Sequence, residues 1–144
     1  MAVAIDIKRL MCGIEVGGPQ TSDFDLNPNA ERFSTSKLRT AGVLVSFIER
    51  PTGLNLILTK RASHLKHHPG QIAFPGGRMD EGDPDVIATA LREAHEEIGL
   101  TADNVEVLGQ LPPHETVSQY SMVPILGRIR DDFDAICEAG EVAE

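Results

Sequence analysis

The stretch Arg92-Glu-Ala-His-Glu-Glu-Ile-Gly-Leu100 decides how the rest of the chain is interpreted. It completes a segment whose residue types predict a helix over Pro84–Ile98. Asp83 is expected to be the N-cap, and Pro84 suits the first helical position because its missing N–H has no helical partner there. Gly99 is expected to end the helix. The sequence therefore predicts one long helix with an acidic C-terminal half.

The predicted helix has an apolar face with an acidic edge. At about 100° per residue, six apolar side chains fill an arc of roughly 140°. They are Val86, Ile87, Ala90, Leu91, Ala94 and Ile98. Glu93, Glu96 and Glu97 fall within an arc of about 100°, and Glu97 lies inside the apolar arc. Acids this close repel one another, more so when partly buried. A divalent cation would relieve this repulsion, and carboxylate oxygens suit Mg²⁺ or Mn²⁺.

The alternative interpretation is an ordinary acidic helix face in contact with solvent. Arg92 and Glu96 would then form a routine ion pair one turn apart, worth a few tenths of a kcal/mol. The pattern E-x-x-E-E alone does not separate the two interpretations. The segments around the helix are needed to do so.

Segments with strand character lie on both sides of this helix. The predicted strands are Ala41–Ile48, Leu54–Thr59, Ile72–Phe74, Val105–Leu111 and Val123–Ile129. Strands on both sides of one helix predict an α/β sandwich with a mixed sheet. Helices and strands do not alternate regularly, which disfavours a doubly wound parallel sheet.

The two ends of the chain differ from this middle part. Residues 1–35 are expected to form an N-terminal extension, with a short helix over Ile5–Met11 followed by a loop. The residues expected to end this helix are Gly13, Gly17, Gly18 and Pro19. Residues 36–144 are expected to form a single domain. The acidic, alanine-rich tail from Asp131 to Glu144 is expected to begin a further helix.

Composition excludes several classes of protein. The chain has 144 residues, with 13 Lys and Arg against 22 Asp and Glu, and a formal net charge of −9. This balance argues against broad contact with nucleic acid and against docking on anionic lipid. Cys12 and Cys137 form no CxxC pair, which excludes a disulfide scaffold and a cysteine zinc site. No signal peptide or membrane-spanning run is evident, so the cytoplasm is the expected location.

The segment from Gly77 to Leu100 resembles the signature box of the Nudix hydrolases, G-x5-E-x7-R-E-U-x-E-E-x-G-U with U apolar. The second half matches at Arg92, Glu93, Ala94, Glu96, Glu97, Gly99 and Leu100. The first half departs, because Asp83 stands in place of Glu and eight residues, not seven, separate it from Arg92. We interpret this as an insertion before the helix. The resemblance implies a Nudix-like α/β/α sandwich and hydrolysis of a diphosphate linked to another moiety.

An upstream stretch resembles the additional motif of the coenzyme A pyrophosphatase branch of these proteins, L-L-T-x-R-[SA]-x3-R-x3-G-x3-F-P-G-G. It runs from Ile57 to Gly77 and departs at two positions. Ile57 replaces the first Leu. Lys66 replaces the second Arg, which keeps the positive charge but loses the bidentate fork.

A third stretch, Thr116–Pro124, resembles the T-x-S-G-F-x-V-x-P sequence of the same branch, with Gln119, Tyr120 and Met122 changed. The resemblance as a whole covers about residues 36–144. It implies that the substrate is coenzyme A or its thioesters, cleaved to 3′,5′-adenosine diphosphate and 4′-phosphopantetheine or its acyl form.

The resemblance also implies roles for the matching helix residues. Glu93, Glu96 and Glu97 would bind Mg²⁺ or Mn²⁺, and Glu93 would be a ligand or the general base. Arg92 would orient a glutamate through an ion pair. A general base outside the box is common in the family, and the sequence does not choose among three candidates: Glu115, Glu141 and Glu144.

The implied substrate-binding residues lie upstream of the helix. Arg61 and Lys66 are cations in an otherwise acidic chain and would clamp a phosphate of the substrate. Gly76 and Gly77 would form a tight bend that approaches phosphate. Three histidines, His64, His67 and His68, could suggest zinc, but no fourth ligand stands in register, so a hydrogen bond to substrate or a packed imidazole is expected instead. His114 is expected to be a loop residue.

Two further hypotheses stay open. The chain could be a Nudix hydrolase of another nucleoside diphosphate, such as ADP-ribose or NADH, or a non-catalytic binding module with the same fold. The stretch Glu141-Val-Ala-Glu144 resembles one that usually leads into another strand and a closing helix. The domain is therefore expected to be incomplete at its C-terminal end, with an exposed sheet edge that a homodimer could cover.

Overall fold

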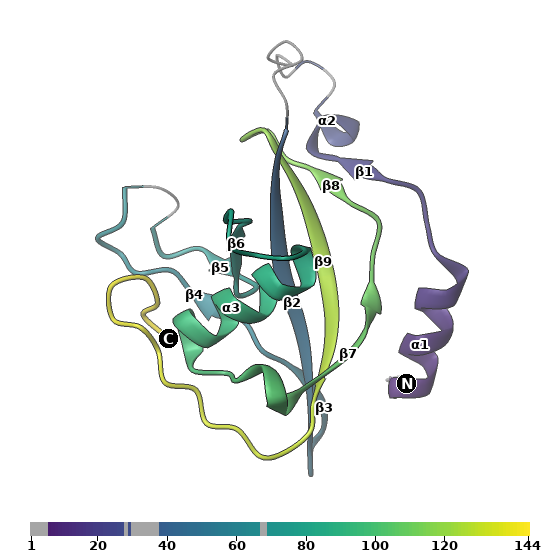
Figure 1. Cartoon of the computed structure of the whole chain (residues 1–144), viewed down its shortest axis with the longest axis vertical. Coiled ribbons are helices and arrows are strands. Elements are labelled where there is room, and N and C mark those ends of the chain that lie inside the picture. The colour runs from purple at the N-terminus through teal and green to yellow at the C-terminus, as the bar shows by residue number, and fades with distance from the viewer. Residues whose placement is uncertain (1–5, 28, 30–37, 67–68) are drawn as a thin grey trace.

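The computed structural model describes residues 6–27, 29, 38–66 and 69–144 (Figure 1). Its elements in chain order are α1 (Ile7–Val16), β1 (Thr21–Ser22), α2 (Asp23–Leu26), β2 (Arg39–Arg50), β3 (Gly53–Leu56), β4 (Thr59–Lys60), β5 (Ile72–Ala73), β6 (Gly76–Arg78), α3 (Val86–Ile98), a 3₁₀ turn (Ala102–Asn104), β7 (Val105–Gln110), β8 (His114–Glu115) and β9 (Tyr120–Ile129).

The described strands form one large mixed sheet and one small sheet. The long strands β2 and β9 lie side by side and parallel within the large sheet (Figure 1). β3 and β6 pair antiparallel with β2, and β7 and β8 pair antiparallel with β9. β4 and β5 form the separate antiparallel pair. The predicted α/β fold with a mixed sheet is confirmed.

The predicted apolar face of α3 is buried against the large sheet. It meets Leu44 of β2 and Ile125 of β9, whose side chains are fully buried. All six predicted core residues of the helix belong to this hydrophobic cluster or pack against it. The 3.6-residue period of the sequence therefore located both the helix and its buried face.

Gly42 lets β2 approach α3 closely. A methyl group at Gly42 would lie 2.6 Å from the carbonyl oxygen of Val86 and 3.2 Å from the backbone nitrogen of Ala90. Because these are helix backbone atoms, we expect Gly42→Ala to lower the free energy of unfolding by about 1–3 kcal/mol, measured by urea denaturation. Gly82→Ala is the control, since a methyl group there meets nothing within 4 Å. Equal stabilities of the two variants would contradict this packing.

The start of α3 differs from the prediction. The helix begins at Val86, and its N-cap is Asp85, whose Oδ1 accepts a hydrogen bond of 2.8 Å from the backbone N–H of Ala88. The prediction that Asp83 caps the helix is wrong, because the Asp83 carboxylate accepts hydrogen bonds from the side chains of Thr89 and Arg92 within the helix. The predicted end is confirmed, since Gly99 follows the helix with a φ of 74°.

The N-terminal helix is longer than predicted. α1 continues through Gly13 to Val16 and is ended by Gly17, one of the predicted terminating residues, which has a φ of 65°. The predicted start at Ile5 lies outside the described residues. A single glycine costs a helix only about 1 kcal/mol, so Gly13 does not end it. Asp6 starts the helix by accepting a hydrogen bond from the backbone N–H of Arg9.

Two further predictions about local structure are wrong. Gly76 and Gly77 do not form a turn but belong to strand β6, which pairs with β2. The tail over 131–144 forms no helix. Its backbone binds the carbonyls at the end of α3 instead, which have no partner within the helix. The N–H of Ile136 donates to the carbonyl of Ile98 at 3.0 Å, and the N–H of Glu138 donates to the carbonyl of Glu97 at 2.8 Å.

β1 connects the N-terminal segment to the large sheet. It pairs parallel with β8, and His114 of β8 lies 2.7 Å from the hydroxyl of Thr21 and 2.9 Å from a carboxylate oxygen of Asp23. His114 is therefore a strand residue and not the expected loop residue. The division at residue 35 stays a prediction. None of the helices described is both long and apolar enough to cross a membrane.

Candidate functional site

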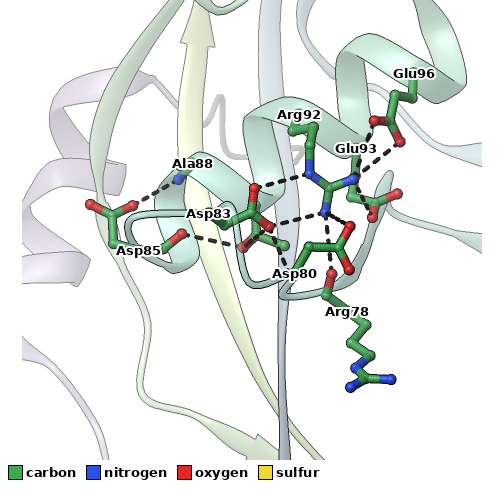
Figure 2. Close-up of polar contacts among 9 residues, drawn as sticks. Arg78, Asp80, Asp83, Asp85, Ala88, Arg92, Glu93 and Glu96 are labelled. Carbon is green, nitrogen blue, oxygen red and sulfur yellow. Dashed lines mark hydrogen bonds and ion pairs between the residues drawn. The ribbon is translucent and has the colours of Figure 1, made fainter.

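Arg92 of α3 is the centre of a network of carboxylates (Figure 2). Its Nε and Nη2 donate to the two oxygens of Asp83 at 3.0 and 3.1 Å, a bidentate pair. Its Nη1 lies 3.0 Å from an oxygen of Glu93 and 3.1 Å from one of Glu96. Nη2 also donates to the backbone carbonyl of Arg78 at 3.2 Å. One guanidinium thus joins the segment before α3 to two of the predicted metal ligands.

Asp83 fixes the position of this guanidinium. Its side chain is 7% exposed and also accepts hydrogen bonds of 3.0 Å from the backbone N–H of Asp80 and the hydroxyl of Thr89. The Arg92 guanidinium and the Asp80 N–H hold the pKa of Asp83 far below its usual value. The Asp83 carboxylate in turn raises the pKa of Arg92. Asp83 therefore serves as an anchor for Arg92.

Glu97 is buried, with only 6% of its surface exposed. Burial raises the pKa of Glu97 to about 7, and the charges of Glu93 and Glu141 add to the shift. The backbone N–H of Gly76, which donates to the Glu97 carboxylate, and the charge of Arg61 act in the opposite direction. A buried carboxylate beside two others is costly when ionised, so the position favours a cation.

Glu93 lies directly against the backbone of β6. A methyl group at Gly77 would lie 2.5 Å from an oxygen of Glu93, so a side chain there would displace this carboxylate from its position. Burial is the main cause that raises the pKa of Glu93, and the Arg92 charge opposes it. At Gly76 a methyl group would lie 2.5 Å from the carbonyl oxygen of Gly42. The glycine pair therefore brings β6 close to both β2 and α3.

Glu96 is placed differently from the other two predicted ligands. Its side chain is 55% exposed and its carboxylate is bound to Arg92. Within the described ranges, no group of three or more Asp, Glu, His or Cys side chains converges closely enough to hold a metal ion. The structure thus places Glu93 and Glu97 one helical turn apart beside β6, with Glu96 held outside that pair.

A cleft of about 720 Å³ opens beside Glu97. Its other charged lining residues are three arginines, Arg39 of β2, Arg61 after β4 and Arg78 of β6. In a chain with a net charge of −9, this lining is predominantly cationic. The cleft is therefore suited to an anionic ligand that reaches Glu97.

The predicted substrate-binding residues divide between cleft and surface. Arg61, Gly76 and Gly77 line the cleft. The Nε of Arg61 is buried and, within the part of the chain that is described, has no hydrogen-bond partner. Lys66 is exposed and does not line the cleft. His64 is also exposed, and His67 and His68 lie outside the described residues, so the zinc alternative gains no support.

The C-terminal tail brings one candidate general base to this region. Backbone hydrogen bonds tie the tail to β4 and the residues after it, from Lys60 to Glu144 at 2.7 Å and from Ala62 to Glu141 at 2.8 Å (Figure 1). The charge of Glu141 contributes, after burial and the charge of Glu93, to the raised pKa of Glu97, and it contributes least among the causes that shift the pKa of Glu93. Glu144 instead pairs with Lys60 at 2.6 Å. The third candidate base, Glu115, lies in β8.

Arg39, Arg78 and Tyr120 are cleft residues that the sequence did not single out for function. They come from three strands, and the register of the sheet brings them together: Arg39 is paired with Tyr120, and Arg78 with Ala41. The only signal in the sequence was the departure at Tyr120 from the branch motif.

Comparisons with known proteins agree with this fold. The model of the NUDIX domain matches residues 38–138. An uncharacterized Nudix hydrolase, NudL, from Enterobacter sp. strain 638 is 46% identical over 105 residues, which cover 73% of this chain and 54% of that protein. The chain therefore spans about half the length of this relative.

Solved structures show the same fold at low sequence identity. A Nudix hydrolase from M. smegmatis, RenU, matches with a TM-score of 0.63 at 20% identity, over 88% of this chain and 76% of that one. The NUDIX domain of Shewanella oneidensis NrtR, solved in complex with ADP ribose, matches with a TM-score of 0.57 at 18% identity, over 85% and 79% of the two chains.

Proposed function

The chain belongs to the NUDIX domain family, and we propose that it hydrolyses the diphosphate bond of a nucleoside diphosphate derivative with the help of a divalent metal ion. The observation that carries this proposal is the position of Glu97. A buried glutamate with neighbouring carboxylates lies at a cleft whose other charged lining residues are arginines. A metal ion bound to the carboxylates would neutralise their negative charge, and a diphosphate bound to the arginines would neutralise their positive charge.

The donor chemistry of the site fits Mg²⁺ or Mn²⁺. Glu93 and Glu97 offer carboxylate oxygens, the ligands these hard cations prefer. Both have a raised pKa, mainly from burial and also from charges of the same sign, and a bound cation would remove this repulsion. Glu96 would complete the set once its carboxylate leaves Arg92. When bound, the cation neutralises the diphosphate and polarises the attacking water.

The chain's own residues would orient the metal ligands, bind the phosphate and accept the proton of the water. Arg92, anchored by Asp83, orients Glu93. The unsatisfied Nε of Arg61 donates to a phosphate oxygen. Water attacks phosphorus, its oxygen forms the new bond, and the bond to the bridging oxygen breaks as the second phosphate leaves. We assign the proton of the water to Glu141 among the three candidate bases, because it is the candidate whose charge contributes to the pKa shifts of Glu93 and Glu97.

We propose coenzyme A or its thioesters as the substrate, with 3′,5′-adenosine diphosphate and 4′-phosphopantetheine as products. The support is the branch motif around Arg61 together with a cleft of about 720 Å³ that three arginines line. Lys66 would contribute only if the segment that carries it moved toward the cleft. A homodimer and the cytoplasmic location stay predictions.

The test is product release from coenzyme A, ADP-ribose and NADH, measured with Mg²⁺, with Mn²⁺ and with chelator. We expect cleavage of coenzyme A that requires the metal. Metal-dependent cleavage of ADP-ribose or NADH alone would retain the glutamate site and overturn the choice of substrate. A chain that melts cooperatively and cleaves none of the three would contradict the proposed hydrolysis and favour a binding module.

A further inference from the structure

Arg39 lines the cleft and its guanidinium contacts two residues of the neighbouring chain segment, Tyr120 and Ser118. Its guanidinium carbon lies 4.3 Å from the centre of the Tyr120 ring, and its Nη2 donates to the carbonyl of Ser118 at 3.3 Å. An arginine stacked on an aromatic ring keeps its N–H edge directed outward and loses little freedom when it binds an anion. Both Arg39 and Tyr120 line the cleft. The pair is therefore a preorganised cation within it.

The register of the sheet gives the distance from Arg39 to the acidic end. Arg39, Ala41 and Val43 alternate along one face of β2, and all three line the cleft. Val43 is paired with Gly76, whose N–H binds Glu97. At about 3.3 Å per residue, Arg39 starts roughly 13 Å along the strand from that point. A diphosphate bound beside Glu97 would therefore leave Arg39 free for another group of the same ligand.

The surroundings of Arg39 fit a phosphate. Thr116 and Ser118 line the same end of the cleft, with their hydroxyl oxygens 3.0 Å apart. Arg78, paired with the residue two positions along β2 from Arg39, adds a second guanidinium. The Arg78 side chain points away from the carboxylates around Arg92 (Figure 2). Guanidinium forks and hydroxyls are the groups that bind phosphate oxygens.

We propose that Arg39, positioned by Tyr120, selects substrates that carry a phosphate monoester on the nucleoside in addition to the diphosphate. This inference rests on the proposed function, because it assumes that the diphosphate lies at the Glu97 end. It assigns substrate selectivity to β2 and β9, outside the helix that carries the glutamates. Arg39 would lower the KM for such substrates without contacting the reacting phosphorus.

The test measures binding without turnover. The affinities of 3′,5′-adenosine diphosphate and adenosine 5′-monophosphate are compared by calorimetry for the wild-type chain, Arg39→Gln and Arg39→Lys. We expect the wild type to prefer the 3′-phosphorylated nucleotide by about tenfold or more, the value typical of a charge-assisted hydrogen bond. Arg39→Gln should reduce the preference to about twofold or less, and Arg39→Lys should retain part of it.

Arg50→Gln is the matched control. Arg50 is at the opposite end of β2, bound to Asp132 at 3.0 Å and away from the cleft, so its loss should leave the preference intact. The inference would be overturned if the wild-type chain bound both nucleotides with the same affinity, or if Arg39→Gln lowered the affinity for both nucleotides by the same factor. An Arg39-dependent preference in a chain that hydrolyses nothing would support the selective site while refuting the proposed function.

Discussion

Glu97→Gln is expected to stabilise the metal-free protein at pH 8 while lowering metal-dependent hydrolysis by about 100-fold or more. The loss of activity follows from removing a proposed ligand, since even groups that only support a metal site are worth about 10–100-fold. The gain in stability follows from burial, because Gln at this position carries no charge. One substitution would thus show that the Glu97 charge is needed for hydrolysis but destabilises the metal-free fold.

The pKa of Glu97 sets the pH range of this gain. Its value is about 7 in the folded chain against an ordinary value of 4.5. A raised pKa in the folded state means that the unfolded chain releases this proton first as the pH rises. Glu97 therefore costs nothing below about pH 4.5, costs progressively more up to pH 7, and reaches a plateau above it, at up to about 3 kcal/mol.

Thermal unfolding with chelator at pH 5 and pH 8 measures this effect. The Tm of Glu97→Gln should exceed that of the wild type by several degrees at pH 8, and by much less at pH 5. Glu81→Gln is the control, because Glu81 is exposed and precedes the helix. If Glu97→Gln and the wild type had the same Tm at pH 8, burial of the Glu97 carboxylate would be contradicted.

Arg92→Lys is expected to lower metal-dependent hydrolysis by about 10–100-fold, the range found for groups that orient metal ligands. Lysine keeps the charge but cannot bind Asp83 with two parallel hydrogen bonds while it also contacts Glu93 and Glu96. The loss should appear mainly in kcat, because Arg92 does not line the cleft that would hold the substrate.

Arg128→Lys provides a matched comparison for this variant. Arg128 also contacts two glutamates, Glu49 at 2.9 Å and Glu106 at 3.9 Å, but on the sheet and away from α3. Steady-state kinetics should show no change for this control. If Arg92→Lys retained full kcat, the role of Arg92 in orienting Glu93 would be refuted.

The helix and its two faces were predictable because both are local. A period of 3.6 residues placed Ile98 and its neighbours in the core, and it placed Glu97 inside the apolar arc, where the structure shows a buried glutamate. The N-cap was predicted wrongly because Asp83 and Asp85 both precede the helix and both are suitable caps. Arg92, nine positions after Asp83, decides between them by binding Asp83.

The cleft was less predictable, because sheet register and the path of the tail create it. Arg39 meets Tyr120 across β2 and β9, although 80 positions separate them, and no local pattern encodes that pairing. The tail places Glu141 near α3 through backbone hydrogen bonds with β4 and the segment after it. Lys66 was assigned to the substrate from a motif, and a motif does not state where a loop side chain lies.

The most direct test of the central claim, that Glu97 helps to hold a divalent cation at this cleft, is thermal unfolding at pH 8 during a titration with Mn²⁺. A ligand that binds only the folded state raises Tm with its concentration. The wild-type Tm should rise as Mn²⁺ is added, and the Tm of Glu97→Gln, starting higher, should rise much less. An equal rise in both proteins, or no rise in the wild type, would contradict the proposed metal site.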